Sequence, residues 1–204
     1  GNDYFFTYQT SNVGRFEDPG ICFYTNEEDM RGRGEGRIVA TVHNECTEVS
    51  ETRLEFIVRM QWQGPEEGYA PKYRRVVGEE MRTVNVYPGE TANVIDVRSQ
   101  LRPTDRDIRL GPSRHGYFTV RVADHLRVVD PNGERQGGRL IDSEGRENEE
   151  VCWQHADWVD YYGTDEQGRT AGIAVFQFPT LRNSAWYAAT YGTIRVNPFR
   201  KGAT

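Results

Sequence analysis

The sequence predicts an all-β protein: an antiparallel β-sandwich of about ten to thirteen strands with little helix. Three observations lead to this prediction. Apolar and polar residues alternate with a period of two, turn-forming residues recur at short intervals, and no segment sustains the 3.6-residue period of an amphipathic helix. The 204 residues contain no linker and no internal repeat, so we expect one domain over residues 1–204.

The clearest strand covers residues 54–62, where Leu, Phe, Val, Met and Trp alternate with more polar side chains. Residues 171–178 are apolar on both faces apart from Gln177, which predicts a central strand. Weaker or shorter alternation predicts further strands at residues 36–42, 83–87, 94–97 and 118–122.

Turn-forming residues punctuate these strands at residues 87–90, 130–133, 142–145 and 165–168. Each segment combines glycine with proline, aspartate or asparagine, residues that tolerate tight turns and positive φ. A short helical turn is expected only near residues 96–101 or 151–158.

The composition indicates a folded, polar protein. Only 36% of residues are apolar and 27% are charged, but 11 Tyr, 9 Phe and 4 Trp supply enough area for a core. The net charge of −6 argues against non-specific binding to nucleic acid or anionic membrane. No run of 18 apolar residues exists, so we expect no membrane span and a soluble protein, with an extracellular or periplasmic location favoured.

The three cysteines, Cys22, Cys46 and Cys152, are an odd number and exclude a fully paired disulfide framework. Two short motifs, His43-x-x-Cys46 and Cys152-x-x-His155, match zinc spacing only if each pair lies on a tight turn. A zinc site and a Cys46–Cys152 disulfide are therefore alternatives, but buried thiols and a coincidental spacing are the favoured interpretation. We expect no metal and no cofactor.

Acidic and aromatic residues gather near residues 153–162. Aromatic rings stack on the apolar face of a pyranose, and carboxylates bind its hydroxyls or move protons. A desolvated aspartate in such a site has a raised pKa, as an acid catalyst requires. The alternative is that the aromatic residues are core and the acids lie at strand ends. The candidate catalytic residues are Asp157, Asp160, His155 and His115, and the candidate ligand-binding residues are Trp153, Trp158, Tyr161 and Trp186.

Several motifs occur in an order that resembles a bacterial family of unknown function labelled methane oxygenase PmoA-like. The motifs lie at residues 137–145, 158–163, 172–176 and 186–199, and the resemblance covers about residues 36–200. The resemblance implies a β-sandwich and work related to carbohydrates. A membrane oxygenase activity is not expected, because this chain has none of the apolar spans that such a subunit needs.

The chain departs from the family pattern at polar positions. His115 stands where the family has an acidic residue, Gln177 and Phe178 stand where it has Asp-His, and Tyr187 stands where it has histidine. Catalysis needs placed titratable groups, so these changes weaken the expectation of an enzyme.

Two functions from different classes remain. The first is a carbohydrate-related protein that binds or processes a sugar in an aromatic and acidic cleft. The second is a non-catalytic structural subunit that assembles into a homo-oligomer through strand edges, supported by the abundance of Tyr and Arg. The expected partners are a sugar or glycan, or further copies of the chain, and not nucleic acid.

Overall fold

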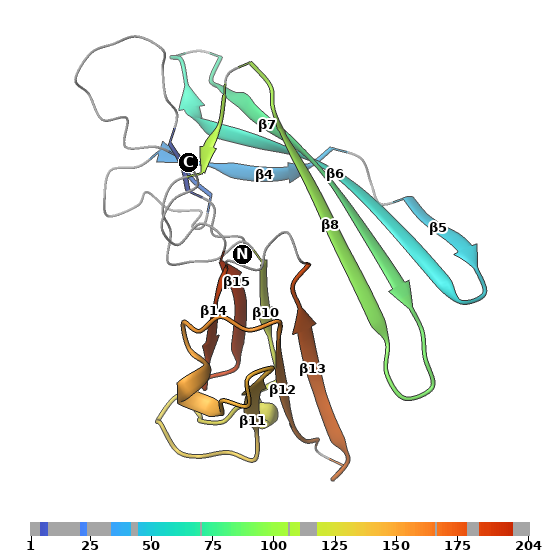
Figure 1. Cartoon of the computed structure of the whole chain (residues 1–204). Helices are drawn as coiled ribbons and strands as arrows, with labels where there is room; N and C mark the ends of the chain where they lie inside the picture. Colours follow the sequence, from blue (N-terminus) through green and yellow to red (C-terminus); the bar gives the residue numbers. More distant parts are fainter. Residues whose placement is uncertain are drawn as a thin grey trace. The chain divides into compact units, whose positions relative to one another are not determined.

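Antiparallel β-strands make up most of the described chain, as the two-residue alternation predicts (Figure 1). The structure is a computed structural model, and it describes residues 5–7, 21–23, 34–41, 45–69, 71–105, 107–110, 118–165, 167–178 and 184–197. The chain divides into two compact units, one of Phe6–Arg109 and one of Leu110–Thr204 together with Gly1–Phe5. The single domain over residues 1–204 stays a prediction.

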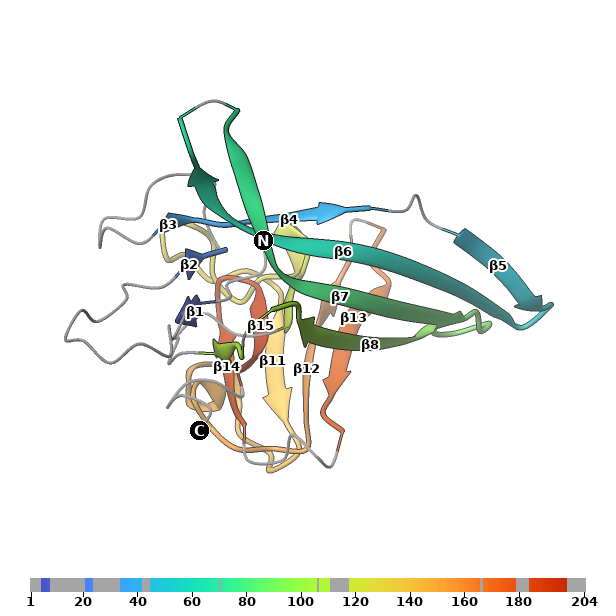
Figure 2. The ribbon, with the colours of Figure 1, turned by 90° about the horizontal axis from the view of Figure 1, so that it is seen from above.

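The unit of Phe6–Arg109 is built on a five-stranded antiparallel sheet in the order β4-β6-β7-β8, with β5 also paired to β6. Figure 2 shows β6, β7 and β8 running side by side along this sheet. The strands are β4 (Arg37–Ala40), β5 (Glu45–Ser50), β6 (Arg53–Glu67), β7 (Tyr73–Tyr87) and β8 (Val94–Pro103). Four short strands form another sheet in the order β3-β2-β1-β9: β1 (Phe5–Thr7), β2 (Ile21–Cys22), β3 (Gly34–Glu35) and β9 (Arg109–Leu110).

The two faces of the five-stranded sheet differ in polarity. Because residues opposite each other on neighbouring strands point to the same side, the register gathers apolar side chains on one face. That mainly apolar face carries Leu54, Phe56, Val58, Met60 and Trp62 of β6, Val84 and Val86 of β7, and Val97 and Leu101 of β8, and it also carries Glu80 and Arg82 of β7 and Ser99 of β8.

A buried carboxylate, Glu80, ties three of these strands together. Its Oε2 accepts a hydrogen bond from Trp62 Nε1 at 2.9 Å, and its Oε1 accepts one from Ser99 Oγ at 2.8 Å. Arg82 donates two more to Oε1, from Nε at 3.0 Å and Nη2 at 2.8 Å. A buried charge is tolerated only when it is paired and hydrogen-bonded, and Glu80 meets both conditions.

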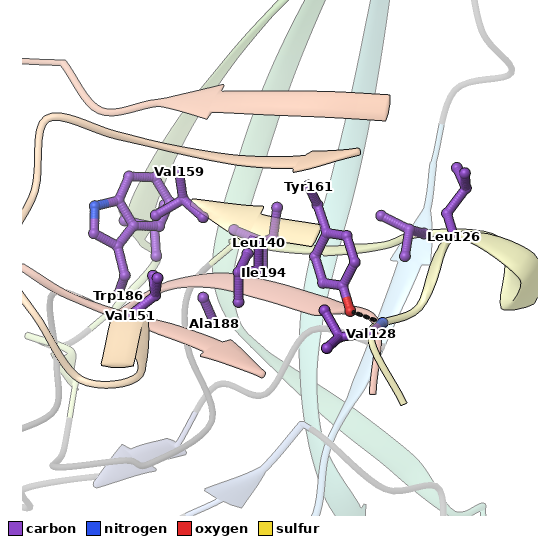
Figure 3. Packing of buried hydrophobic residues seen from close by; sticks show 11 residues of the cluster. Leu126, Val128, Leu140, Val151, Val159, Tyr161, Trp186, Ala188 and Ile194 are labelled. Carbon is purple, nitrogen blue, oxygen red and sulfur yellow. Dashed lines mark hydrogen bonds between the residues drawn. The ribbon is translucent and has the colours of Figure 1, made fainter. Parts of the chain in front are cut away.

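The unit of Leu110–Thr204 is a small sandwich of two three-stranded antiparallel sheets. One sheet has the order β10-β15-β14 (Phe118–Arg121, Thr193–Asn197 and Ala185–Ala189), and the other has the order β11-β12-β13 (Arg139–Asp142, Trp158–Thr164 and Thr170–Phe176). Two 3₁₀ turns, η1 (Asp124–Leu126) and η2 (Asn148–Val151), lie between strands. Inward side chains of both sheets form one apolar cluster, which includes Leu140, Val151, Val159, Trp186 and Ile194 (Figure 3).

Two buried aromatic residues fix polar groups inside this sandwich. The Tyr161 hydroxyl donates to the Thr190 carbonyl at 2.6 Å and accepts from the Val128 N–H at 2.9 Å (Figure 3). The Trp186 indole N–H donates to the Ala156 carbonyl at 2.8 Å. Because both side chains are fully buried, these bonds satisfy backbone groups that water does not reach.

The same five-residue turn occurs twice, once directly after β11 and once between β12 and β13. In each, an aspartate Oδ1 accepts the N–H groups of the residues two and four positions later, and the fourth residue is a glycine with φ of +79° or +78°. The fifth residue is an arginine whose Nε donates to the same carboxylate, at 2.7 Å for Arg146 on Asp142 and 2.8 Å for Arg169 on Asp165. Residues 130–134 repeat the aspartate and glycine part of the pattern.

The structure confirms the all-β antiparallel prediction, the predicted strands at 54–62 and 118–122, and the turn segments. Two expectations are wrong. Residues 96–101 belong to strand β8 and not to a helical turn, because their side chains alternate across the sheet. Strand β13 is an edge strand in the described sheet and not a central one. The prediction failed because the exposed face of β13 carries the small residues Gly172 and Ala174, which count as apolar although they are exposed.

Replacing Tyr161 by phenylalanine is expected to lower the free energy of unfolding by about 1–2 kcal/mol, because a buried hydroxyl with two backbone partners is lost. Tyr162→Phe is the matched control on the opposite face of β12, and we expect a change within about 0.5 kcal/mol. Urea unfolding of both variants measures the difference. Equal losses in the two variants would contradict the role given to Tyr161.

Candidate functional site

Strand β12 presents Trp158, Asp160 and Tyr162 on one face, away from the core. The residues between them, Val159 and Tyr161, are fully buried in the sandwich. Since successive side chains of a strand point to opposite sides, the first three project from the outer face of the sheet. All three are half-buried.

The neighbouring strands extend this outer face through their register. On β13, Phe176, Ala174 and Gly172 lie opposite Trp158, Asp160 and Tyr162. On β11, Ile141 lies opposite Asp160, and Arg139 lies opposite Tyr162. We call these eight residues the Trp158 face: Arg139, Ile141, Trp158, Asp160, Tyr162, Gly172, Ala174 and Phe176. Phe176 is 69% exposed, so an aromatic ring stands in solvent at one end of the face.

Gly172 allows Tyr162 to lie close to β13. A Cβ at Gly172 would lie 2.5 Å from the Tyr161 carbonyl oxygen and 2.7 Å from the Tyr162 Cβ, which is closer than real Cβ contacts. Only glycine therefore fits at this register position without a shift of the strand or of Tyr162. The Trp158 face thus contains a low strip, formed by Gly172 and Ala174, beside the row of larger side chains on β12.

The Asp160 carboxyl is electrostatically unusual. Burial raises its pKa above the ordinary value, and a hydrogen bond from the Tyr161 backbone N–H offsets part of this rise. The raised pKa expected for an aspartate of this segment is therefore found at Asp160. A half-buried carboxyl beside aromatic rings is suited to accept hydrogen bonds from ligand hydroxyls.

Asp157 and His155 lie on the segment that leads into β12, and both are exposed. The Asp157 N–H donates to Ser143 Oγ at 2.9 Å, and the His155 carbonyl accepts from Arg146 Nη2 at 2.6 Å. These bonds fix the backbone and leave both side chains toward solvent. His115 lies outside the described residues.

Trp153 does not join the Trp158 face. Its ring meets the ring of Tyr187, with centroids 4.9 Å apart, and Tyr187 projects from β14 of the other sheet. Trp153 also has a φ of +63°, a left-handed conformation that bulky residues rarely adopt. A hydrogen bond from its N–H to the Trp186 carbonyl, 2.7 Å long, holds this conformation.

Tyr187 is the centre of a second aromatic group on the outer side of β14. Its hydroxyl lies 2.9 Å from the Tyr191 hydroxyl, and the Arg195 guanidinium lies 5.1 Å from its ring centre. The hydrogen bond with Tyr191 and burial raise the pKa of Tyr187 to about 12. Tyr187 is therefore a neutral hydroxyl at physiological pH.

The structure brings together only part of the predicted site. Trp158 and Asp160 share one face, while Tyr161 and Trp186 lie fully buried in the core with their polar atoms bonded to backbone, so neither side chain is exposed on that face. Sequence reasoning missed Tyr162, Arg139 and Phe176. The alternation along β12 is a sufficient signal for Tyr162, whereas Arg139 and Phe176 depend on the pairing of distant strands.

Among the residues that the structure describes, no group of three or more His, Cys, Asp or Glu side chains is placed to hold a metal ion. The alternative of a Cys46–Cys152 disulfide stays a prediction, because the side chain of Cys46 is not described. His43 and the side chains of Cys22 and Cys46 lie outside the described part of the chain. Within that part, no helix has the length and apolarity required to cross a membrane.

The fold and the face define an all-β protein with a small two-sheet sandwich that presents aromatic and acidic side chains on an outer sheet face. The chain belongs to a family of unknown function, DUF6807, which matches residues 5–204. Membership of an uncharacterised family is thus confirmed, while the family's description contains no methane-oxygenase label. Neither the comparison with curated proteins nor the comparison with solved structures gives a match.

Asp160 and Asp165 are expected to affect stability in opposite directions. The pKa of Asp160 is raised in the folded protein, so its stabilising contribution exists below the ordinary value of 3.8 and is lost as the pH rises through the folded pKa. The hydrogen bond from the Arg169 N–H lowers the pKa of Asp165, so its contribution exists above 3.8 and is lost as the pH falls. Urea unfolding at neutral pH should show Asp160→Asn more stable than wild type and Asp165→Asn less stable.

The gain from Asp160→Asn is expected to be no more than about 0.5 kcal/mol, because solvent screens a half-buried charge. Both differences should vanish below the pKa values of the two carboxyls. A gain for Asp160→Asn that persisted in acid would show that burial of the charge is not its cause.

Proposed function

We propose that this protein binds a carbohydrate chain across the Trp158 face. One observation supports the proposal above all others: Trp158, Asp160 and Tyr162 project side by side from one strand and remain half-exposed. A pyranose has an apolar face of C–H groups and an edge of hydroxyls. Aromatic rings pack against the first, and a carboxylate accepts hydrogen bonds from the second.

The spacing of the aromatic residues favours a chain of sugars over a single sugar. Trp158 and Tyr162 are four residues apart on one strand, a separation of roughly 13 Å between their Cα atoms. That distance exceeds the length of one pyranose ring, so two rings of a ligand are needed to contact both side chains. Asp160, midway between them, is placed to accept hydroxyls near the linkage.

The low strip beside β12 supports the same proposal. Gly172 and Ala174 have little or no side chain, so a ligand can approach the Asp160 carboxyl from the side of β13. Arg139, opposite Tyr162, adds an exposed cation that can donate hydrogen bonds to a hydroxyl or an acidic sugar. The proposal is for binding, and the catalytic roles of Asp157, Asp160, His155 and His115 stay predictions.

A panel of mono- and oligosaccharides tests the proposal by calorimetry or on a glycan array. We expect oligosaccharides to bind more tightly than their monosaccharides, and Trp158→Ala and Tyr162→Ala each to weaken binding about tenfold or more, equivalent to about 1.4 kcal/mol. Tyr69→Ala is the matched control, because Tyr69 is a fully exposed aromatic residue outside this face. Unchanged affinity in Trp158→Ala, or no glycan bound by the wild type, would refute the site.

The pH dependence of the same measurement isolates Asp160. Only the ionised carboxylate accepts hydrogen bonds with both oxygens, so binding should weaken as the pH falls through the raised pKa of Asp160. Asp160→Asn should bind more weakly at neutral pH and lose this pH dependence, while Asp157→Ala should keep it. A pH profile that followed Asp157 instead would move the ligand to the segment before β12.

A further inference from the structure

Strand β8 forms an exposed edge of the five-stranded sheet. Among the described strands it pairs only with β7, and it is ten residues long. Val94 and Ile95 are 57% and 58% exposed, and the side chains of Asp96, Arg98 and Arg102 are also exposed. An edge strand of this length presents a row of backbone N–H and C=O groups to another strand.

From the charges and polarity of this edge, we infer that two copies of the chain pair through β8, antiparallel, about a two-fold axis at Ser99. This register places Asp96 opposite Arg102 of the second copy, Val97 opposite Leu101, and Arg98 opposite Gln100. The two-fold symmetry makes each of these pairs twice. Opposite charges and apolar residues directly across an antiparallel pair each stabilise it.

The two faces of the sheet continue correctly across this junction. Val97 and Leu101 belong to the apolar face of the sheet, so they meet the same side chains of the second copy on that face. Asp96, Arg98 and Arg102 lie on the opposite, polar face. The result is one continuous sheet in both copies, with Ser99 of each copy meeting at the axis on the mainly apolar side, beside Arg82 and Glu80.

Other registers are less favourable. A shift of two residues in either direction places Arg98 opposite Arg98 or opposite Arg102, and like charges across a pair are destabilising. A shift of one residue places the apolar face of one copy against the polar face of the other. Pairing Asp96 with Arg98 satisfies these charges but sets Arg102 opposite Ala92, which precedes the strand.

This pairing is independent of carbohydrate binding, because β8 and the Trp158 face belong to different units. It also gives the predicted self-assembly through strand edges a defined strand and register. The closed two-fold arrangement uses the edge of β8 in both copies, so it yields a dimer and not an open filament.

Sedimentation or light scattering of the 204-residue chain over a range of concentrations tests the inference. The wild type is expected to reach twice the chain mass, and Arg102→Asp to weaken dimerisation at least tenfold, because two Asp96–Arg102 pairs become like-charge pairs. The double variant Asp96→Arg/Arg102→Asp should restore the dimer. Arg121→Asp, which changes an exposed arginine on β10, is the matched control and should dimerise as the wild type does.

A wild type that stays monomeric, forms open-ended polymers, or is unaffected by Arg102→Asp overturns the proposal, as does a double variant that fails to restore dimerisation. Hydrogen exchange of the wild type gives a second measurement that needs no variant. Amides of residues 94–102 should become more protected as the protein concentration rises. Protection independent of concentration overturns the pairing even where a variant does not fold.

Discussion

The sandwich depends on the two-sided character of strand β12. Val159 and Tyr161 pack into the core, while Trp158, Asp160 and Tyr162 stand on the outer face. The Tyr161 hydroxyl fixes which face of β12 is buried, because it accepts a hydrogen bond from the Val128 N–H and donates one to the Thr190 carbonyl inside the unit. A one-residue slip would bury Asp160 and expose Tyr161, so the anchoring of the core also positions the candidate site.

Much of this arrangement follows from alternation alone. The period of two predicts the strands, and the aspartate–glycine segments predict the hairpins that join them. The same alternation separates Tyr162 from Tyr161, although their shared aromatic character does not. Arg139 and Phe176 could not be predicted, because they meet β12 only through strand pairing, and register between distant strands is not encoded locally.

A count of apolar residues predicts a central strand at β13, but β13 lies at the edge of the described sheet. Residues 171–176 contain no charge, yet every second one is exposed. Gly172 and Ala174 bury little area in either state, so their exposure costs little, and Gly172 is required by the approach of Tyr162. Burial depends on the size of a side chain as well as its polarity. In the proposed site, an apolar strand with small residues at two of its exposed positions forms the low side of the Trp158 face.

The carboxylates of the turns are less available to a ligand than the carboxyl of Asp160 on the sheet. Asp142 and Asp165 direct their oxygens to backbone N–H groups and to the arginine of their own turn, so these acceptors are already occupied. Asp160 differs, because it lies within a strand, receives one backbone hydrogen bond, and has a pKa raised by burial. A carboxyl whose environment disfavours its charge gains most from a partner that donates hydrogen bonds. In this protein that condition is met at Asp160, between two aromatic rings on the outer face of β12.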